Sequence, residues 1–160
     1  VTFPKFFRQF LNNAYIGALH LKEKKMNYWL MKTEPSEYGW SHFEAETVAC
    51  WDGVRNYAAR KHMNAMKIGD QVLFYHSVKN PGVIGTATVV KESYQDPTTE
   101  DERWVAVDIK IGEKLPRPVS LQEIKAEDRL KDMVLVNISR LSVQPVMKEE
   151  WDIVLEMGRG

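Results

Sequence analysis

Seven adjacent residues near the middle of the chain carry side chains that could hold a planar ligand. Residues 51–57 read Trp-Asp-Gly-Val-Arg-Asn-Tyr, which places two aromatic rings, a carboxylate, a guanidinium and an amide in one segment. Aromatic faces beside hydrogen-bonding groups are what a protein needs to bind a nucleobase. The alternative is a turn that caps a helix, with Trp51 in the core, because buried tryptophan is common. The segment alone leaves both interpretations open.

Polar side chains also end a predicted strand over residues 71–77. Alternation along a strand places Tyr75 and Ser77 on one face and His76 on the other. These three polar tips could line the mouth of a pocket. They could equally finish the strand, with His76 as a hydrogen-bonded structural histidine.

Two further segments allow both a functional and a structural interpretation. Lys32, Thr33 and Glu34 close the first predicted strand. A lysine beside a carboxylate could transfer a proton or bind an anion, or it could form a surface ion pair that contributes less than about 1 kcal/mol. Ser142, near the C-terminal end of the chain, could hydrogen-bond the edge of a ligand or pair with a neighbouring strand.

Composition narrows the classes of function. The 160-residue chain has the size of one domain, and a chain of this length buries about 70% of its unfolded surface. The single cysteine, Cys50, cannot form an internal disulfide, and the histidines show no metal-site spacing with it (His20, His42, His62 and His76). Phosphate-loop, dinucleotide and nucleophile motifs are absent. We therefore expect no metal, no cofactor and no conventional enzyme site.

The sequence also bears on location and assembly. No apolar run approaches the roughly 18 residues of a membrane span, so we expect no contact with a membrane. The single cysteine fits a reducing compartment, and no heptad pattern predicts a coiled coil. These features predict a cytoplasmic protein that is monomeric or only weakly dimeric.

Charge is unevenly distributed, although the formal net charge is zero. Residues 1–25 hold five Lys or Arg and one Glu, so residues 26–160 carry 17 basic and 21 acidic side chains. A body with this acidic excess is a poor general clamp for DNA, since non-specific affinity comes from neutralising many phosphates. Residues 51–67 are locally basic, whereas residues 92–102 are acidic. The pattern predicts a focused basic mouth rather than a broad basic face.

Strand signals begin only after Met26, whereas the apolar residues of the preceding segment recur at helical spacing. We expect residues 1–25 to be an N-terminal extension outside the core and residues 26–160 to be one domain. The predicted strands are 28–33, 71–77, 83–93, 104–111 and 138–143, with residues 115–118 extended. The predicted short helices are 37–43, 57–66, 120–125, 128–133 and 148–157, the second of them capped by Asn56. This pattern predicts an α+β domain with a small, twisted, barrel-like sheet.

Taken together, ordered blocks of the sequence resemble the EVE domain, a member of the PUA-like group. The longest blocks are Trp51–Arg60 and Phe74–Ser77. The others are Tyr28–Pro35, Gly69–Asp70, Pro81–Gly85, Trp104–Asp108 and Arg140–Val143. The resemblance runs in order from Tyr28 to about Leu155 and excludes residues 1–25.

The resemblance implies a PUA-like mixed β pseudobarrel of about five or six strands with short peripheral helices. It also implies a non-enzymatic module that binds nucleic acid through a modified base, most plausibly a modified cytosine such as 5-methylcytosine, flipped from DNA into a pocket. A relation to the YTH readers of N6-methyladenine keeps RNA open. The loop between Tyr94–Pro97 and Trp104 is shorter and more acidic here than in many EVE domains, which predicts weak binding or a preference for small or single-stranded ligands.

On this hypothesis, side chains from several segments form the site. Trp29 and Trp51 would supply apolar or stacking walls, and asparagine and serine side chains would bind the Watson–Crick edge of the base. The full set of base-binding candidates is Trp29, Lys32, Trp51, Val54, Arg55, Asn56, Tyr75, His76, Ser77, Leu141 and Ser142. Arg60 and Lys61 are the candidates for contact with the phosphate backbone.

Two alternatives belong to other classes of function. Another branch of the PUA-like group contains amidohydrolases that use Lys, Thr and Glu, so Lys32, Thr33 and Glu34 could serve a small hydrolase acting on a modified nucleoside. Against this, Thr33 should point away from its two neighbours on a strand. The second alternative is a protein-interaction domain.

Overall fold

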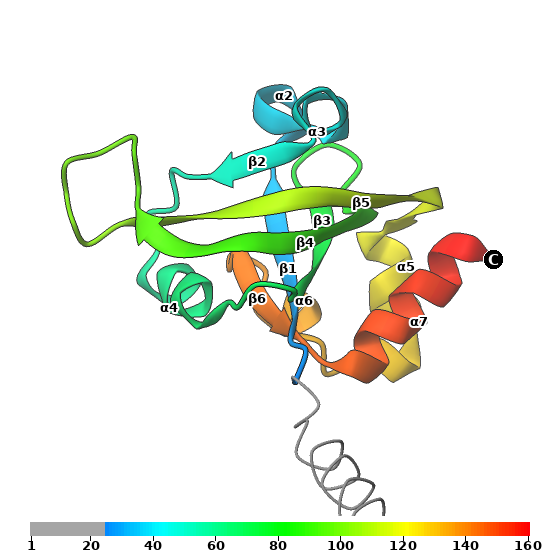
Figure 1. Ribbon diagram of the computed structural model, residues 1–160. Coiled ribbons are helices and arrows are strands. Elements are labelled where there is room, and N and C mark those ends of the chain that lie inside the picture. Colours follow the sequence, from blue (N-terminus) through cyan, green and yellow to red (C-terminus); the bar gives the residue numbers. More distant parts are fainter. Residues whose placement is uncertain (1–24) are drawn as a thin grey trace, which may run out of the picture.

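A six-stranded mixed sheet forms the centre of the molecule (Figure 1). The structure, a computed structural model, describes residues 25–160, so the predicted N-terminal extension lies outside the described residues except for Lys25. The strands are β1 (Tyr28–Thr33), β2 (Val48–Trp51), β3 (Gln71–His76), β4 (Gly82–Gln95), β5 (Val105–Ser120) and β6 (Val143–Val146). Their order across the sheet is β2-β5-β4-β3-β1-β6. With short helices around it, this sheet confirms the predicted PUA-like α+β fold.

Short helices surround the sheet. They are α2 (Pro35–Tyr38), α3 (Trp40–Glu46), α4 (Tyr57–Ala65), α5 (Leu121–Ala126), α6 (Val134–Asn137) and α7 (Lys148–Arg159), with a 3₁₀ turn at Asp128–Leu130. Asn56 caps α4 as predicted, because its Oδ1 accepts a hydrogen bond from the Ala59 amide at 2.9 Å. The side chains of Ser120 and Glu123 cap α5 reciprocally. These caps fix where the chain leaves the sheet.

One parallel strand pair determines where the chain can build a site. β1 and β3 run parallel, and the other strand pairs are antiparallel. The chain between β1 and β3 carries α2, α3, β2 and α4, which gives it the length that a parallel crossover needs. The carboxyl ends of β1 and β3 therefore meet at one edge, where the Ser77 amide donates to the Thr33 carbonyl at 2.9 Å.

The two faces of the sheet bury two separate apolar clusters. Val72 and Phe74 face α3 and α4, together with Trp51, whereas Leu73 and Tyr75 face α5, α6 and α7. The alternation predicted for β3 is therefore confirmed. We call these sides the Trp51 face and the Tyr75 face.

The prediction of a strand over residues 138–143 was wrong. The short helix α6 ends at Asn137, a turn follows, and the edge strand β6 begins only at Val143 and continues through Pro145. Proline is tolerated there because an edge strand has one side that needs no ladder hydrogen bond. Two other features differ from the prediction. The strand β2 was not predicted, and the segments 104–111 and 115–118, which were predicted separately, belong to one long strand, β5.

Candidate functional site

A pocket of about 490 Å³ opens on the Trp51 face, beside the carboxyl end of β1. We call it the Trp51 pocket. It is lined by Thr33, Glu37, Tyr38, Glu46, Cys50, Trp51, Asp52 and Gly53. Its volume lies within the range of small-ligand sites in proteins. The lining comes from β1, α2, α3, β2 and the turn after β2, so only the crossover between β1 and β3 brings it together.

Trp51 forms the apolar wall of this pocket. It ends β2, opposite Val107 of β5, and its ring meets Tyr38 and Phe74 edge to face at centroid distances of 6.3 and 5.8 Å. The residue is 8% exposed. Its indole N–H makes no hydrogen bond within residues 25–160, yet it is not one of the fully buried polar atoms left without a partner, so the N–H is accessible from the pocket. Trp51 is therefore both a core residue and a pocket wall whose indole donor is free to meet a ligand.

Carboxylates gather at the mouth of the Trp51 pocket. Glu37, Glu46 and Asp52 line it, and the Tyr38 hydroxyl donates to Glu46 Oε2 at 2.8 Å. Burial and this carboxylate together raise the pKa of Tyr38. Thr33 Oγ1 donates to the Tyr38 carbonyl at 2.8 Å, which holds α2 against the end of β1. The mouth thus presents hydrogen-bond acceptors to any ligand that enters.

Cys50 lies on the rim in a short hydrogen-bonded chain. Its Sγ is 3.0 Å from the Tyr94 hydroxyl, which donates to Asp108 Oδ1 at 2.5 Å. Burial, the largest cause, raises the pKa of the Cys50 thiol. This shift favours the thiol over the thiolate, and the thiolate is the nucleophilic form.

The turn after β2 is held by a single buried carboxylate, Asp96. Its Oδ2 accepts from the Gly53 amide and from Arg55 Nη1, both at 2.8 Å, and its Oδ1 accepts from Thr98. The Asp96 side chain is fully buried. Burial disfavours its charged form, but the hydrogen bonds from Thr98, Arg55 and Gly53 outweigh that cost and lower its pKa. Arg55, a predicted ligand contact, therefore braces the wall of the pocket.

The basic and acidic segments of the sequence lie against each other. Arg55 pairs with Asp96 at 2.8 Å, and Lys67 approaches Glu92 at 3.4 Å. Arg60 lies over the rings of Tyr57 and Trp104 at 5.0 and 5.8 Å. The sequence did not predict this pairing, because the two segments are far apart along the chain and meet only in the folded structure. The predicted basic mouth is consequently neutralised in part, although Lys61 stays exposed.

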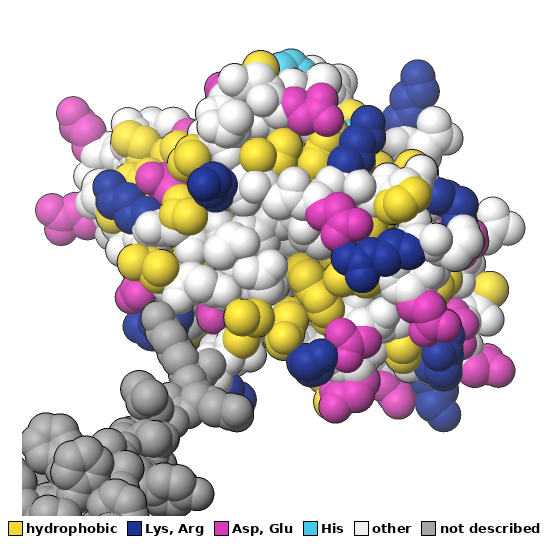
Figure 2. All heavy atoms as spheres, turned by 45° about the vertical axis from the view of Figure 1, so that its right-hand side comes forward, with side chains coloured by type: hydrophobic (Ala, Val, Ile, Leu, Met, Phe, Trp, Pro, Cys, Tyr) yellow, Lys and Arg dark blue, Asp and Glu magenta, His cyan; other side chains and the backbone are white. Residues whose placement is uncertain are grey.

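The face shown in Figure 2 has no broad patch of one charge. Basic and acidic side chains alternate across it. Ion pairs on α5, α7 and the segments beside them include Lys148 with Asp152 at 2.7 Å and Arg159 with Glu113 at 2.6 Å. This surface is a poor track for a phosphate backbone.

Lys32, Tyr75 and Ser77 line a different, smaller pocket on the Tyr75 face, with a volume of about 210 Å³. Lys32 Nζ donates to the Ser139 carbonyl at 2.7 Å and lies 5.6 Å from the centre of the Tyr75 ring. Burial lowers the pKa of Lys32. We call this cavity the Tyr75 pocket, and the sheet separates its apolar lining from Trp51.

His76 has a structural contact. Its Nε2 accepts a hydrogen bond from the Trp40 amide, at the start of α3, over 3.1 Å. Burial lowers the pKa of His76, so the neutral ring that this bond requires is favoured.

Four other predicted ligand contacts lie outside the Trp51 pocket. Asn56 uses its side-chain oxygen to cap α4, and Val54 packs against the apolar cluster of the Trp51 face. Leu141 is buried in the same cluster, and the Ser142 carbonyl accepts from the Lys32 amide at 2.9 Å.

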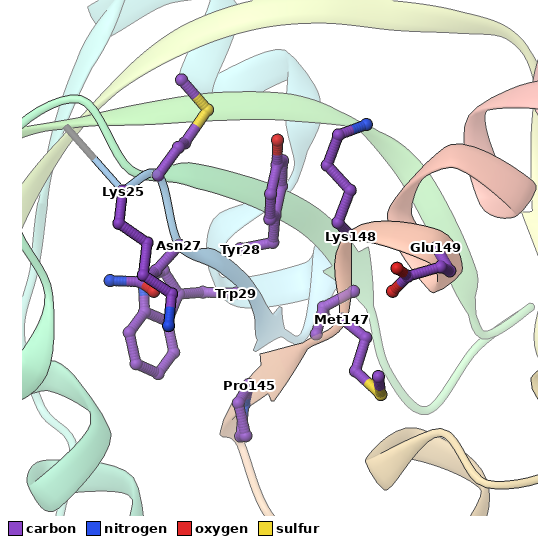
Figure 3. Close-up of a pocket in the computed structure, with 10 residues that line it drawn as sticks. Lys25, Asn27, Tyr28, Trp29, Pro145, Met147, Lys148 and Glu149 are labelled. Atoms are coloured by element: carbon purple, nitrogen blue, oxygen red, sulfur yellow. The ribbon is translucent and has the colours of Figure 1, made fainter. Parts of the chain in front are cut away.

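Trp29 lines a pocket of about 900 Å³ at the opposite end of β1 (Figure 3). Pro145 of β6 lies next to it, and Lys25 and Asn27 flank its indole ring. The Trp29 N–H donates to Asp70 Oδ2 at 2.9 Å. We call this cavity the Trp29 pocket. Its tryptophan is already engaged by a buried carboxylate, in contrast to Trp51.

Sequence reasoning missed most of the lining of the Trp51 pocket. Tyr38, Glu46 and Cys50 were not candidates, and neither was Asp96, which braces the pocket wall. A signal was present for Asp96, since it lies in the Tyr94–Pro97 block that resembles the family pattern. The others become neighbours only through β2, which is a four-residue strand.

Within residues 25–160, no three His, Cys, Asp or Glu side chains are grouped as metal ligands. No helix in the same range is long and apolar enough to cross a membrane.

Comparisons with known proteins place this geometry in a family. Mouse thymocyte nuclear protein 1 is 36% identical over 165 residues, covering 82% of this chain and 73% of that protein. The crystal structure of human THYN1 protein in complex with 5-methylcytosine-containing DNA is 35% identical, with a TM-score of 0.77, and covers 84% of this chain and 98% of that chain.

A more distant likeness supports the fold alone. The YTH domain of Zygosaccharomyces rouxii MRB1, solved with N6-methyladenosine RNA, is 16% identical with a TM-score of 0.57, covering 86% of this chain and 89% of that chain.

Residues 27–157 match the EVE domain family. The chain therefore belongs to the EVE domain family.

Proposed function

We propose that this protein is a non-enzymatic module that binds nucleic acid by holding a modified base, most plausibly 5-methylcytosine in DNA, in the Trp51 pocket. The observation that carries the proposal is the free indole wall of Trp51 in a pocket of about 490 Å³. The human relative bound to 5-methylcytosine-containing DNA supports the same class of ligand.

The acceptors at the mouth favour a base with an exocyclic amino group. Cytosine presents its N4 amino group as a donor, and Asp or Glu carboxylates accept from it. Glu37, Glu46 and Asp52 supply such acceptors, whereas thymine or uracil would turn a carbonyl oxygen toward the same charge. The Trp51 indole N–H is a donor that can meet a ring nitrogen or carbonyl of cytosine. A methyl group at C5 adds apolar surface that the rings of Trp51 and Tyr38 can cover.

Recognition of a base inside a duplex requires that the base leave the stack. Unstacking costs a few kcal/mol, and stacking on one aromatic side chain returns about 1–3 kcal/mol per base. The charges around the pocket add little general affinity, because Arg55 and Lys67 are paired with acids. We therefore expect micromolar or weaker binding.

The geometry gives no support to a hydrolase built from Lys32, Thr33 and Glu34. Lys32 lines the Tyr75 pocket, Thr33 lines the Trp51 pocket, and Glu34 lines a third cavity beside α2. Alternation along β1 sends neighbouring side chains to opposite faces. The three groups cannot act on one bond in this arrangement.

The test is a titration with matched oligonucleotides that contain 5-methylcytosine or plain cytosine, as single strands and as duplexes, in DNA and RNA. We expect tighter binding to the methylated member of each DNA pair. Cys50 is the only cysteine and lies on the rim, so its alkylation, measured at alkaline pH where the thiolate forms, should slow when the base occupies the pocket. No preference for any modified base over its parent, in DNA or in RNA, would remove the proposal.

Preference for DNA over RNA, a monomeric state and a cytoplasmic location belong to the same proposal. Analytical ultracentrifugation measures whether the protein is a monomer, and the paired titrations measure the preference for DNA over RNA. Cell fractionation tests the location, for which the word "nuclear" in the name of the mouse relative indicates a different compartment for that protein.

A further inference from the structure

The connection between β3 and β4 contains a strained turn. The Lys79 amide donates to the Ser77 carbonyl at 2.9 Å, across the single residue Val78, whose φ is +69°. A γ-turn with positive φ is the rare and strained form, and a β-branched residue is among the least suited to it. Asn80, two residues further on, also has positive φ, at +47°. Strain of this kind is kept at positions where the surroundings or a function require it.

Val78 is also the most exposed of the large apolar side chains described. It is 75% exposed and lies at the rim of two pockets. Lys32 and Lys125 line one of these pockets, and Lys79 lines the other. The turn thus presents an apolar tip with cationic side chains around it, which are features suited to a base stack and its phosphates.

The turn and the Trp51 pocket belong to the same edge of the sheet. Ser77 is hydrogen-bonded to Thr33, and Thr33 lines the Trp51 pocket. Val78 shares a cavity with Pro35 and Ser36 at the start of α2, while Glu37 and Tyr38 at its end line the Trp51 pocket. Figure 1 shows the β3–β4 connection close to α2 and α3. One short helix therefore lies between the exposed valine and the pocket.

We propose that Val78 is a wedge that enters the base stack of a DNA duplex and occupies the space left by a base that moves into the Trp51 pocket. The proposal rests on the proposed function. It adds a second contact, and it adds a specific consequence: the wedge contributes only when the base must leave a duplex. A single strand has no paired stack to fill, so binding of a single strand should not depend on Val78.

The test uses Val78→Gly, with Asn80→Gly as its matched control. Both replace a positive-φ residue of the same turn with the residue that suits this conformation. Only the first removes the apolar tip. Each protein is titrated with a duplex that carries one 5-methylcytosine, and with the methylated strand alone. A 2-aminopurine next to the methylated base reports by its fluorescence how far the stack is opened.

We expect Val78→Gly to weaken binding to the duplex about tenfold or more, to reduce the 2-aminopurine signal, and to leave single-strand binding unchanged. Asn80→Gly should leave both affinities unchanged. Val78→Asn, which tolerates positive φ and replaces the apolar tip with an amide, should behave like Val78→Gly. Melting of Val78→Gly at or above the wild-type temperature shows that the fold is intact, since the strain is relieved.

Equal duplex affinity for wild type and Val78→Gly would overturn the wedge, as would a parallel loss of single-strand binding. These failures differ from a failure of the proposed function. If the proposed function fails, the wild-type protein shows no preference for a methylated oligonucleotide over its plain parent, even as a single strand.

Discussion

A pocket lies at each end of β1, one holding Trp29 of β1 and the other Trp51 of β2, and the two indole N–H groups differ in their hydrogen bonding. Trp29 and Trp51 are 6% and 8% exposed. Trp29 donates its indole N–H to Asp70, which also accepts from the amides of Asn27 and Lys67. Trp51 has no such partner among residues 25–160, and acceptors line the mouth in front of it. Pocket volume alone would favour the Trp29 side, at about 900 against 490 Å³.

The hydrogen bonding of the two indole groups, rather than pocket size, is the reason for proposing the Trp51 side as the ligand site. A buried polar group is costly unless it is hydrogen-bonded, so the bond to Asp70 completes the Trp29 side internally. The Trp51 donor can be completed by a ligand. A similar contrast separates Asp70 from Asp96: the first closes a structural junction, and the second braces the turn that carries a wall of the Trp51 pocket.

The largest expected effect is that of Trp51→Ala. Removal of a buried indole should cost about 3–5 kcal/mol of stability and abolish binding of the methylated oligonucleotide. Trp51→Phe should remain folded and lose about 1–3 kcal/mol of binding free energy, because stacking surface and the indole donor are reduced. Trp29→Phe is the control, and it should leave binding unchanged. Equal loss of binding in the two Phe variants, measured by titration, would remove the distinction between the pockets.

Asp70→Ala should come next, with an effect on stability alone. It leaves the amides of Asn27 and Lys67 and the Trp29 indole without their common acceptor. We expect a loss on the order of 3 kcal/mol in the free energy of unfolding, with binding by the folded fraction unchanged. Denaturant titration in parallel with oligonucleotide binding measures both. Weaker binding by fully folded Asp70→Ala would mean that the two ends of β1 are coupled.

Asp96→Asn should have a smaller effect that depends on pH. At neutral pH we expect a loss of about 2 kcal/mol, less than for a fully buried pair because Arg55 is partly exposed. The folded-state pKa of Asp96 is below the ordinary value of 3.8. Its ionised form therefore stabilises the fold fully above pH 3.8, and this contribution is lost as the pH falls from there through the lower folded-state pKa. Unfolding curves of variant and wild type should accordingly converge in acid, and a constant difference would assign the stabilisation to another group.

The smallest expected effect is that of deleting residues 1–25. The family match begins at residue 27, although Lys25 borders the Trp29 pocket. We expect a folded, cooperative domain whose stability changes by less than about 1 kcal/mol, equivalent to a few degrees in melting temperature. Its binding of the methylated oligonucleotide should be unchanged. A molten or insoluble product would show that the Trp29 pocket needs the preceding segment.

The sequence by itself determined much of the framework. Alternation in β3 assigned its two faces, Asn56 identified the start of α4, and ordered blocks identified the family. These features are local, since strand alternation, a helix cap and a contiguous motif are each written in a few neighbouring residues. Trp51 was singled out for the same reason, since its chemistry is concentrated in one segment, and its contact with a base stays a prediction.

Only the tertiary structure decided which of these residues share a cavity. Trp51 and Tyr75 looked equivalent as aromatic candidates, but the sheet places them on opposite faces. Arg55 looked like part of a basic mouth, but Asp96, 41 residues later, neutralises it. The physical reason is that hydrogen bonds and burial act between neighbours in space. The crossover from β1 through β2 to β3 sets those neighbours, and no local pattern encodes it.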